Sequence, residues 1–438
     1  MDAITSELVA MEEPADVDDA VMGDAFIATN AGHYAFLWGE WHHYHNQRGL
    51  WQQAERKAKR DMVDHLKTYR RRKIKVTASR VKGVLEYCEN YLPPEDTLPQ
   101  NGDLIPMRNG VFNVRTGVLH AHAAENYFRH GLDFDYNPQA HCEHWKLTLE
   151  QILVTPAGRT DFDLIAFVQE AMGYCFWGDN RLQAAFLFYG DGGTGKSTII
   201  EVLQSMIQSA VPIDLETLNE YQMASLVDVR LAVVSEFEDN ATFPEAAFKR
   251  LLSSDLVQAR FPHGRPFSFQ PVCTVVGAMN TLPRVKDRSH GVFRRVFIVP
   301  FHRVVASPDV YLAQKLQKEA PGIFAWAMEG LARLRDRGHF QPPQQVVDAG
   351  NEWRYRNDTE RQFINSRYVR VNTDGLIASA ELYRLYKEWC KENGTYAKSQ
   401  AAVARDWKRL GFTSEKKREG MHWRGVESNE IRIDLNHL

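Results

Sequence analysis

The amino-acid sequence predicts an α/β fold built around a phosphate-binding loop. Residues 190–198 read GDGGTGKST and match the pattern G-x-x-x-x-G-K-[ST]. The apolar residues 184–189 directly before this loop are typical of a buried strand, and residues 199–203 after it begin a helix. Two further apolar stretches, 231–234 and 272–279, end in polar residues, as buried strands of such a sheet do.

The predicted loop contains the groups that a nucleoside triphosphate requires. Its glycines let backbone N–H groups approach phosphate oxygens, and the helix N-terminus adds partial positive charge. Lys196 is expected to reach the β- and γ-phosphates, and the Ser197 hydroxyl is expected to hold Mg²⁺. The expected nucleotide-binding residues are Gly190, Gly192, Gly193, Thr194, Gly195, Lys196, Ser197 and Thr198.

Composition limits the class of protein and its compartment. The chain has 438 residues with 44% hydrophobic and 25% charged residues, which is ordinary for a globular protein of about three domains. A net charge of -3 excludes a histone-like protein but leaves room for local nucleic-acid patches. The 5 cysteines are scattered, which favours a reducing cytosol over a disulfide framework. No apolar run reaches about 18 residues and no signal peptide is present, so we expect a cytoplasmic protein without a membrane partner.

Breaks in composition divide the chain. The acidic stretch 12–19 opens it, and the Pro-Pro pairs at 93–94 and 342–343 mark boundaries. The expected parts are an acidic flexible arm at 1–24, an aromatic hairpin with a basic helical segment at 25–100, a middle, collar-like domain at 101–180, an ATPase domain at 181–340 and a C-terminal domain at 351–438.

Two basic segments lie outside the nucleotide-binding core. Residues 52–82 are predicted to be helical, and ten Lys and Arg side chains fall between 56 and 75. Such a run is either a solvated helix face or a nucleic-acid surface. Predicted helices at 380–393 and 399–410 precede a basic hairpin at 412–426, which is the pattern of a winged helix that binds DNA or protein.

Polar residues after the later strands predict the rest of an ATPase site. Glu236 follows a buried strand and is the expected Mg²⁺-side carboxylate, while Glu238 is a candidate for polarising water. Asn280 ends the next strand, where it either contacts the γ-phosphate or simply forms a turn. Arg294 and Arg295 precede a further strand, as an arginine finger does in ring ATPases; surface salt bridges are the alternative.

Between these strands, residues 256–270 predict a hairpin with a basic tip. The tip reads Pro262-His263-Gly264-Arg265. A small-molecule kinase has no evident use for such a hairpin, whereas a hairpin pointing into a channel can grip a phosphate backbone.

The order of these motifs is recognisable. The motifs lie at 109–117 (NGVFNVRTG), 135–140 (DYNPQA), 173–179, 188–198, 235–236, 248–252, 255, 266–269, 280–283 and 293–301. Because these motifs occur in this order, the chain resembles superfamily 3 helicases. The resemblance is specifically to the helicase half of phage and plasmid primase-helicases, which are related to the poxvirus primase-helicase.

The resemblance implies an AAA+-type ATPase core that forms a hexameric ring, hydrolyses ATP with Mg²⁺ and translocates 3′ to 5′ on single-stranded or forked DNA. A mostly helical N-terminal domain and a winged-helix-like C-terminal domain flank this core. The implied catalytic residues are Lys196, Glu236, Glu238, Asn280, Arg294 as the likelier finger and Arg295 close behind, with Ser197 and Glu236 on the metal. The implied DNA-contacting residues of the pore hairpin are Lys249, His263 and Arg265.

The expected function is therefore an ATP-dependent DNA helicase that replicates a phage, plasmid or satellite element in a bacterial cytoplasm. Fewer than about 100 residues precede the middle domain, which is too short for a primase catalytic domain by ordinary domain sizes. We therefore expect that a primase, where one is needed, is another chain, and that this primase or other replication proteins are candidate partners. The alternative is a DNA-binding initiator or loader whose ATPase switches assembly. A kinase or signalling ATPase is disfavoured by Asn280 and Arg294 following a pore-type hairpin.

Overall fold

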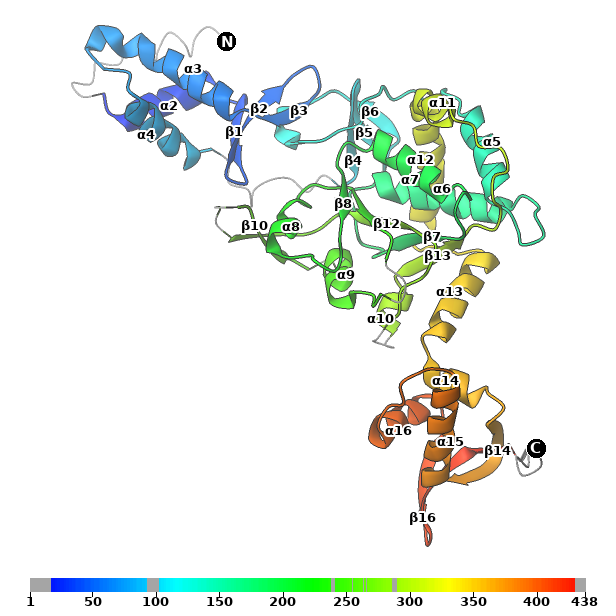
Figure 1. Cartoon of the computed structure of the whole chain (residues 1–438). Coiled ribbons are helices and arrows are strands. Elements are labelled where there is room, and N and C mark those ends of the chain that lie inside the picture. The colour runs from blue at the N-terminus through cyan, green and yellow to red at the C-terminus, as the bar shows by residue number, and fades with distance from the viewer. Residues whose placement is uncertain are drawn as a thin grey trace. The chain divides into compact units, whose positions relative to one another are not determined.

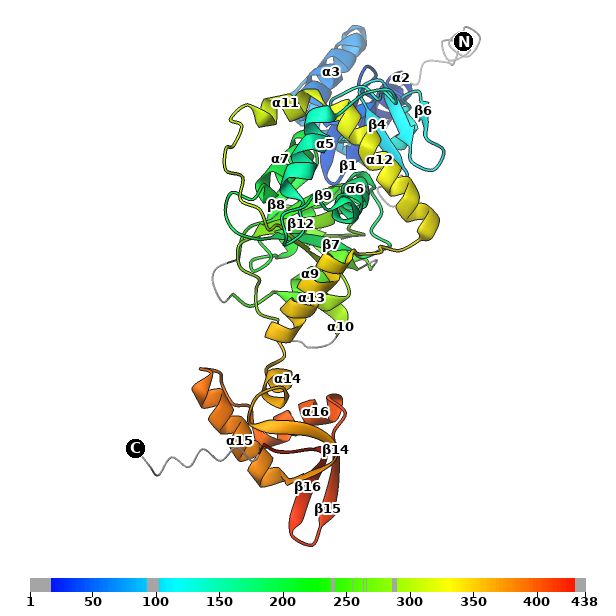
Figure 2. The same cartoon turned by 90° about the vertical axis from the view of Figure 1, so that its right-hand side faces the viewer.

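The structure is a computed structural model that describes residues 17–92, 102–237, 241–253, 255–262, 264, 266–285 and 290–429 (Figures 1 and 2). The chain divides into two compact units. The first unit comprises Met1–Glu236, Ala246–Asn280 and Pro300–Pro343, and the second comprises Phe237–Glu245, Thr281–Val299 and Gln344–Leu438. Across the described ranges, no helix has the length and apolar character needed to cross a membrane.

The first unit begins with helices packed on a small antiparallel sheet. The helices are α2 (Asp19–Thr29), α3 (Glu55–Thr68), the short 3₁₀ helix η1 (Tyr69–Arg72) and α4 (Ala78–Glu89), and the strands are β1 (Tyr34–Leu37), β2 (Glu40–His45) and β3 (Leu50–Gln53). A shared apolar cluster holds them together, with Met22, Phe26, Trp41, Met62 and Leu66 at its centre. The predicted aromatic hairpin is therefore part of a sheet that continues into β3.

Two predictions about this region are wrong in detail. The expected arm at 1–24 is too long, because α2 starts at Asp19, the Asp18 carboxylate caps it, and Met22 is fully buried. The predicted helix at 52–82 is interrupted after η1, where Lys73 adopts a left-handed φ of 64° and Thr77 caps the start of α4. β-Branched residues on either side of Lys75 also disfavour a continuous helix.

The middle of the first unit contains a second antiparallel sheet and two long helices. The strands β4 (Leu104–Met107), β5 (Gly110–Asn113) and β6 (Val118–His120) pair in that order and are followed by the short 3₁₀ helix η3 (Ala124–Asn126). Helices α5 (Glu143–Ile152) and α6 (Phe162–Phe176) come next, and α11 (Leu312–Lys318) and α12 (Ala320–Arg337) return later in the chain. α6 and α12 can approach closely because Gly173 has no side chain. A Cβ at this position would lie only 2.5 Å from the Ala327 carbonyl oxygen.

A parallel sheet forms the centre of the first unit, which confirms the predicted α/β fold. Its strands are β7 (Ala185–Tyr189), β8 (Ala210–Ile213), β9 (Leu231–Val234) and β12 (Thr274–Met279). They lie in the spatial order β7-β12-β9-β8, and each neighbouring pair is parallel. β12 thus separates β7 from β9, although β9 precedes it in the chain. Most of the strand residues are buried, as expected for a sheet covered on both faces.

Several short elements connect these strands. α7 (Lys196–Met206) follows β7, α8 (Glu220–Ala224) precedes β9, and α9 (Glu245–Leu252) leads to the hairpin of β10 (Val257–Arg260) and β11 (Pro266–Phe269). After β12 the chain forms α10 (His290–Phe293) and β13 (Val296–Pro300).

The second unit includes the C-terminal residues, which form a small helical domain with an antiparallel sheet. Its elements are α13 (Gln344–Arg356), α14 (Thr359–Ile364), β14 (Val369–Ala378), α15 (Ser379–Glu392), α16 (Gln400–Arg409), β15 (Thr413–Lys417) and β16 (Gly420–Ser428), with strand order β14-β16-β15. Aromatic residues dominate its core, including Phe363, Tyr386, Trp407 and Trp423. The predicted helices at 380–393 and 399–410 and the terminal hairpin are confirmed.

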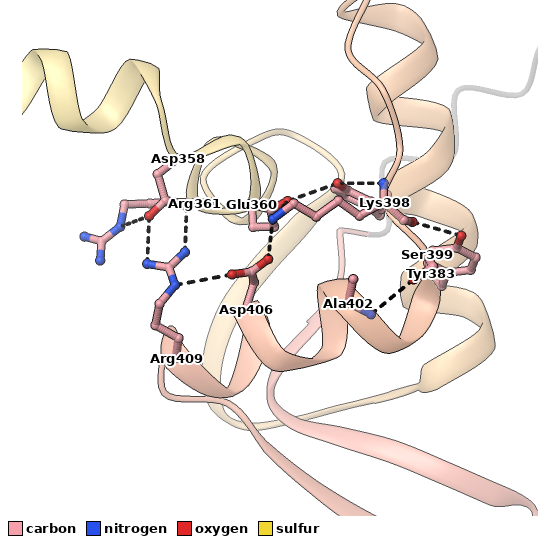
Figure 3. A network of polar contacts seen from close by, with 10 residues as sticks. Asp358, Glu360, Arg361, Tyr383, Lys398, Ser399, Ala402, Asp406 and Arg409 are labelled. Atoms are coloured by element: carbon pink, nitrogen blue, oxygen red, sulfur yellow. Dashed lines mark hydrogen bonds and ion pairs between the residues drawn. The ribbon is translucent and has the colours of Figure 1, made fainter. Parts of the chain in front are cut away.

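A buried polar network fixes α16 against α14 (Figure 3). Arg409 donates to both carboxylate oxygens of Asp358 over 3.0 and 2.8 Å. Lys398 lies 2.6 Å from an Asp406 carboxylate oxygen and 3.3 Å from the carboxylate of Glu360, which is fully buried. The Tyr386 hydroxyl donates to the same Glu360 oxygen over 3.1 Å. Because buried carboxylates are costly without partners, the network holds α16 in one orientation.

Replacing Lys398 tests this network. Lys398→Ala leaves the buried Glu360 carboxylate without its lysine. Because Lys398 is 34% exposed, the expected cost of about 1–2 kcal/mol is smaller than for a fully buried pair. The matched control is Arg384→Ala, because the Arg384–Glu388 pair is about half exposed and such pairs contribute about 0.5 kcal/mol or less. Hydrogen exchange of the α16 amides in the full chain compares the two variants. Protection should fall more in Lys398→Ala than in Arg384→Ala. Equal protection in the two variants would contradict the assignment.

Candidate active site

The predicted phosphate-binding loop lies between β7 and α7, as the sequence indicated. Gly195 precedes the helix with a φ of 92°, a left-handed conformation that glycine adopts readily. No side-chain hydrogen bond caps α7 among the described residues. The first N–H groups of this helix therefore point toward solvent with partial positive charge, which suits an anionic ligand.

Two loop glycines are required by close packing. A Cβ on Gly190 would lie 2.3 Å from the backbone oxygen of Phe301, and one on Gly195 would lie 2.8 Å from Ile152 Cγ2. Gly192 differs from both, since its Cβ would meet nothing within 4 Å. The loop is thus held tightly at its two ends and open in its middle.

Lys196 is the most buried charged residue of the loop, with 5% of its surface exposed. Its ammonium donates to the backbone oxygens of Gly190 and Asp191, both over 2.6 Å, and to Asn280 Oδ1 over 2.9 Å. Burial lowers the pKa of Lys196, and the carboxylates of Glu236 and Asp191 act in the opposite direction. A nearby anion is therefore the partner that this partly desolvated cation favours.

Glu236 and Asn280 meet at the same edge of the sheet. The Asn280 backbone N–H donates to Glu236 Oε1 over 2.8 Å, while the Asn280 side chain receives the bond from Lys196. Both residues are exposed. Glu236 follows β9 and Asn280 follows β12, and these two strands are parallel neighbours. The structure therefore brings together three of the predicted site residues, Lys196, Glu236 and Asn280.

The remaining loop residues have distinct environments. Ser197 is exposed in the first turn of α7, and Thr198 is half-buried beside it. Thr194 is buried, and its hydroxyl donates to the Asp191 backbone oxygen over 2.8 Å. Gly193 has a left-handed φ of 75°. Glu238 lies outside the described residues.

Arg294 and Arg295 differ in their surroundings within the second unit. Arg294 is exposed directly after α10. Arg295 is half-buried and donates from Nη1 to the Gly291 backbone oxygen over 2.7 Å. Burial lowers the pKa of Arg295, and the positive charge of Arg294 lowers it further. Arg295 therefore has a local structural role, whereas Arg294 faces solvent.

The predicted hairpin is confirmed as β10 and β11, which pair from Val257↔Phe269 to Arg260↔Pro266. At its end the Phe261 and Phe267 rings stack with centroids 5.2 Å apart. His263 and Arg265, the expected DNA-contacting residues, lie outside the described residues. Lys249 was assigned to the same hairpin, but it lies on α9, because the chain remains helical to Leu252 before β10 begins.

Two family models and several viral proteins match parts of this chain. Residues 27–154 match the family described as D5 N terminal like, and residues 188–295 match a family of unknown function, DUF5906. The chain is 23% identical over 343 residues to "Putative helicase L207/L206" of Acanthamoeba polyphaga mimivirus, covering 71% of this chain and 35% of that protein. It is 24% identical over 350 residues to "Putative helicase 121R" of Invertebrate iridescent virus 3, covering 70% and 37%. Together these matches support a phage-type primase-helicase family for this chain.

The chain spans about a third of the length of those two viral relatives. Among solved structures, the C-terminal region of NrS-1 is similar with a TM-score of 0.44 and 15% identity, over 68% of this chain and 80% of that chain.

Two separated family motifs contact each other in the middle of the first unit. The Asn109 side-chain amide donates to the Tyr136 backbone oxygen over 3.1 Å, and Asn109 Oδ1 accepts from the Tyr136 N–H over 2.8 Å. Asp135 pairs with Arg108 over 3.0 Å, and Asp133 pairs with Arg48 over 2.7 Å. The contacts of Arg108 and Asn109 therefore hold residues 135–136 against the β4–β5 turn. The Asp133–Arg48 pair links the same loop to the β2–β3 turn.

Sequence reasoning missed one contact of the hairpin. Trp38, in the β1–β2 turn, has a φ of 56°, which is costly for a bulky side chain. Its ring lies 5.1 Å from the Phe267 ring, and the Arg129 guanidinium lies 6.0 Å from the Trp38 ring. The signal in the sequence was the turn Trp38-Gly39. Two-residue hairpin turns that end in Gly favour Asn or Asp at the first position, not Trp. A turn residue that breaks this rule indicates that a tertiary contact holds it there.

Alanine substitutions test the packing of the loop. Gly190→Ala forces a Cβ against the Phe301 backbone, and such overpacking costs about 1–3 kcal/mol. Gly192→Ala is the matched control and should change stability by about 0.5 kcal/mol or less, because its site is open. The measurement is the apparent Tm of the full chain, which should fall by at least about 2 °C for Gly190→Ala alone. A similar Tm in both variants would contradict the described packing.

Proposed function

We propose that this chain is an ATP-dependent DNA helicase that acts in the replication of a phage, plasmid or satellite element. The observation that carries the proposal is the hydrogen-bonded series from Lys196 through Asn280 to Glu236, joining the ends of three strands. A phosphate-binding lysine, a polar sensor and a carboxylate in one place are the parts that phosphoryl transfer needs. The helicase names of the two viral relatives support the choice of DNA unwinding over other uses of ATP.

The residues present fit ATP and Mg²⁺. The uncapped N-terminus of α7 and the Lys196 ammonium would hold the phosphates, as the loop geometry allows. Ser197 and Glu236 supply a hydroxyl and a carboxylate, which are the oxygen donors that Mg²⁺ accepts beside phosphate oxygens. Bound Mg²⁺ would neutralise charge on the β- and γ-phosphates. Glu236 accepts a hydrogen bond from the Asn280 N–H, and Asn280 is proposed to contact the γ-phosphate.

The proposed assembly is a hexameric ring of AAA+ type within superfamily 3, translocating 3′ to 5′ as the resemblance implies. In such a ring Arg294 of one subunit reaches the γ-phosphate bound by its neighbour, and its exposed position supports this role. Glu238 is proposed as the second carboxylate, and the β10–β11 hairpin with His263 and Arg265 as the DNA-gripping element. The C-terminal domain, with α15, α16 and the β15–β16 hairpin, is proposed as a winged helix.

Lys196→Ala tests the helicase function. Loss of the ammonium removes the phosphate contact and leaves Asn280 Oδ1 without its donor, so ATP-dependent separation of a forked duplex should fall at least about a hundredfold. A strand-displacement assay measures the rate of unwinding, and the reaction of the wild-type protein without ATP gives the baseline. A wild-type ring that hydrolyses ATP but never separates a fork would favour the alternative, a replication initiator or loader whose ATPase switches assembly.

Arg294→Ala tests the shared site between subunits. ATP binding should stay within about threefold of wild type because Arg294 is not in the same subunit's loop, whereas steady-state hydrolysis should fall at least about a hundredfold. Fluorescent-nucleotide titration and phosphate release measure the two quantities separately. Arg295→Ala serves as the comparison, since it removes a bond to the Gly291 backbone oxygen. Persistent turnover in Arg294→Ala with loss in Arg295→Ala would reverse the assignment.

A further inference from the structure

Five cations gather in the segment that joins α3 to α4 (Figure 1). We call residues 70–75 the basic turn; its cations are Arg70, Arg71, Arg72, Lys73 and Lys75, and all five side chains are exposed. The basic turn belongs to the first unit and is not part of the proposed ATPase site.

The basic turn differs from the rest of the basic segment in its charge balance. Along α3, Lys57 pairs with Asp61 over 2.5 Å, Lys59 pairs with Glu55 over 2.7 Å and Lys67 pairs with Asp64 over 2.7 Å. Within the described ranges, no ion pair joins a cation of the basic turn to a carboxylate. The sequence also has no Asp or Glu between Asp64 and Glu86. All three acids of α3 are thus paired with cations of the same helix, whereas the cations of the basic turn have no carboxylate partner among the described residues.

Apolar neighbours hold the basic turn in a defined conformation. Tyr69, Ile74 and Val76 are partly buried against the apolar cluster of α2, α3 and α4. The Lys73 N–H donates to the Arg70 backbone oxygen over 3.0 Å, which closes the turn, and Thr77 starts α4 by accepting from the Arg80 N–H over 3.2 Å. Because the apolar residues face the core, the cations between them project into solvent from a fixed backbone.

Helix stability alone does not account for so many cations. Positive side chains are favourable near a helix C-terminus, but this effect falls off within the last turn. The last turn of α3 already contains His65 and Lys67. The five cations of the basic turn lie beyond the end of α3 at Thr68 and repel one another at close range. An external anion is the partner that would offset this repulsion.

We propose that the basic turn contacts the sugar–phosphate backbone of DNA, at a site separate from the ATPase core. Three consecutive arginines favour phosphate oxygens, since guanidinium groups bind them with two parallel hydrogen bonds. The segment offers no exposed apolar side chain for insertion into a membrane, because Ile74 is half-buried. This inference rests on the proposed function, in which DNA is the substrate.

A pair of matched triple variants tests the proposal in the full-length chain. Arg70→Ala/Arg71→Ala/Arg72→Ala removes three cations without carboxylate partners, and Lys57→Ala/Lys59→Ala/Lys67→Ala removes three that are paired. Both change the net charge equally, and all six side chains lie outside the apolar core. Fluorescence anisotropy with a labelled single-stranded oligonucleotide and a labelled fork, without nucleotide and over a salt series, measures affinity.

The arginine variant should bind both DNA probes at least about tenfold more weakly than wild type, and its plot of log K against log salt should be shallower by about 2–3. The paired-lysine variant should stay within about threefold. Hydrolysis of ATP without DNA should be unchanged in both. Equal affinities for the two variants, with wild type binding DNA, would overturn this inference but leave the proposed function standing. No DNA binding by wild type would overturn both. Loss of binding only to phosphatidylserine vesicles in the arginine variant would replace DNA with a membrane.

Discussion

The parallel pairing of β12 between β7 and β9 is the constraint on which the candidate site depends. A residue of the candidate site follows each of these strands, and parallel strands bring their carboxyl ends to one edge of the sheet. The insertion of β12 places Asn280 next to both the phosphate-binding loop and Glu236. The strand order is therefore part of the site.

Packing around the loop enforces the same geometry from the other side. Gly190 lies against the backbone of Phe301, and Gly195 lies against Ile152. These contacts leave no room for a side chain, so both ends of the loop lie close against the neighbouring backbone and side chains. The Lys196 ammonium is in turn held by backbone oxygens of the loop. A buried cation on a rigid backbone is arranged in advance for an anion, which limits the reorganisation that binding requires.

The periphery of the chain separates charge that stabilises from charge that remains available. Lys57, Lys59 and Lys67 are neutralised by acids one helical turn away, whereas the basic turn has no acid in its sequence neighbourhood. In the second unit, by contrast, basic side chains form ion pairs within the domain. There Lys398 and Arg409 are used internally, on Glu360, Asp406 and Asp358, to orient α16. Counting basic residues does not distinguish these uses, because pairing depends on which acids the fold brings near.

The sequence by itself determined most of the elements around the candidate site and the strand–loop–helix arrangement of the predicted phosphate-binding loop, because both depend on short-range spacing. The glycines before Lys196, the apolar runs before it and before Glu236, and the helices at 380–393 and 399–410 were all predicted from residues close in the chain. The start of α2 was missed because its evidence is the burial of Met22 and Phe26 against distant helices. Only the tertiary structure decided that Asn280 joins Lys196 to Glu236, that Trp38 meets Phe267, and that Arg295 is engaged locally while Arg294 is exposed. The physical reason is that these facts depend on strand order and on packing between segments far apart in the chain, which local pattern does not encode.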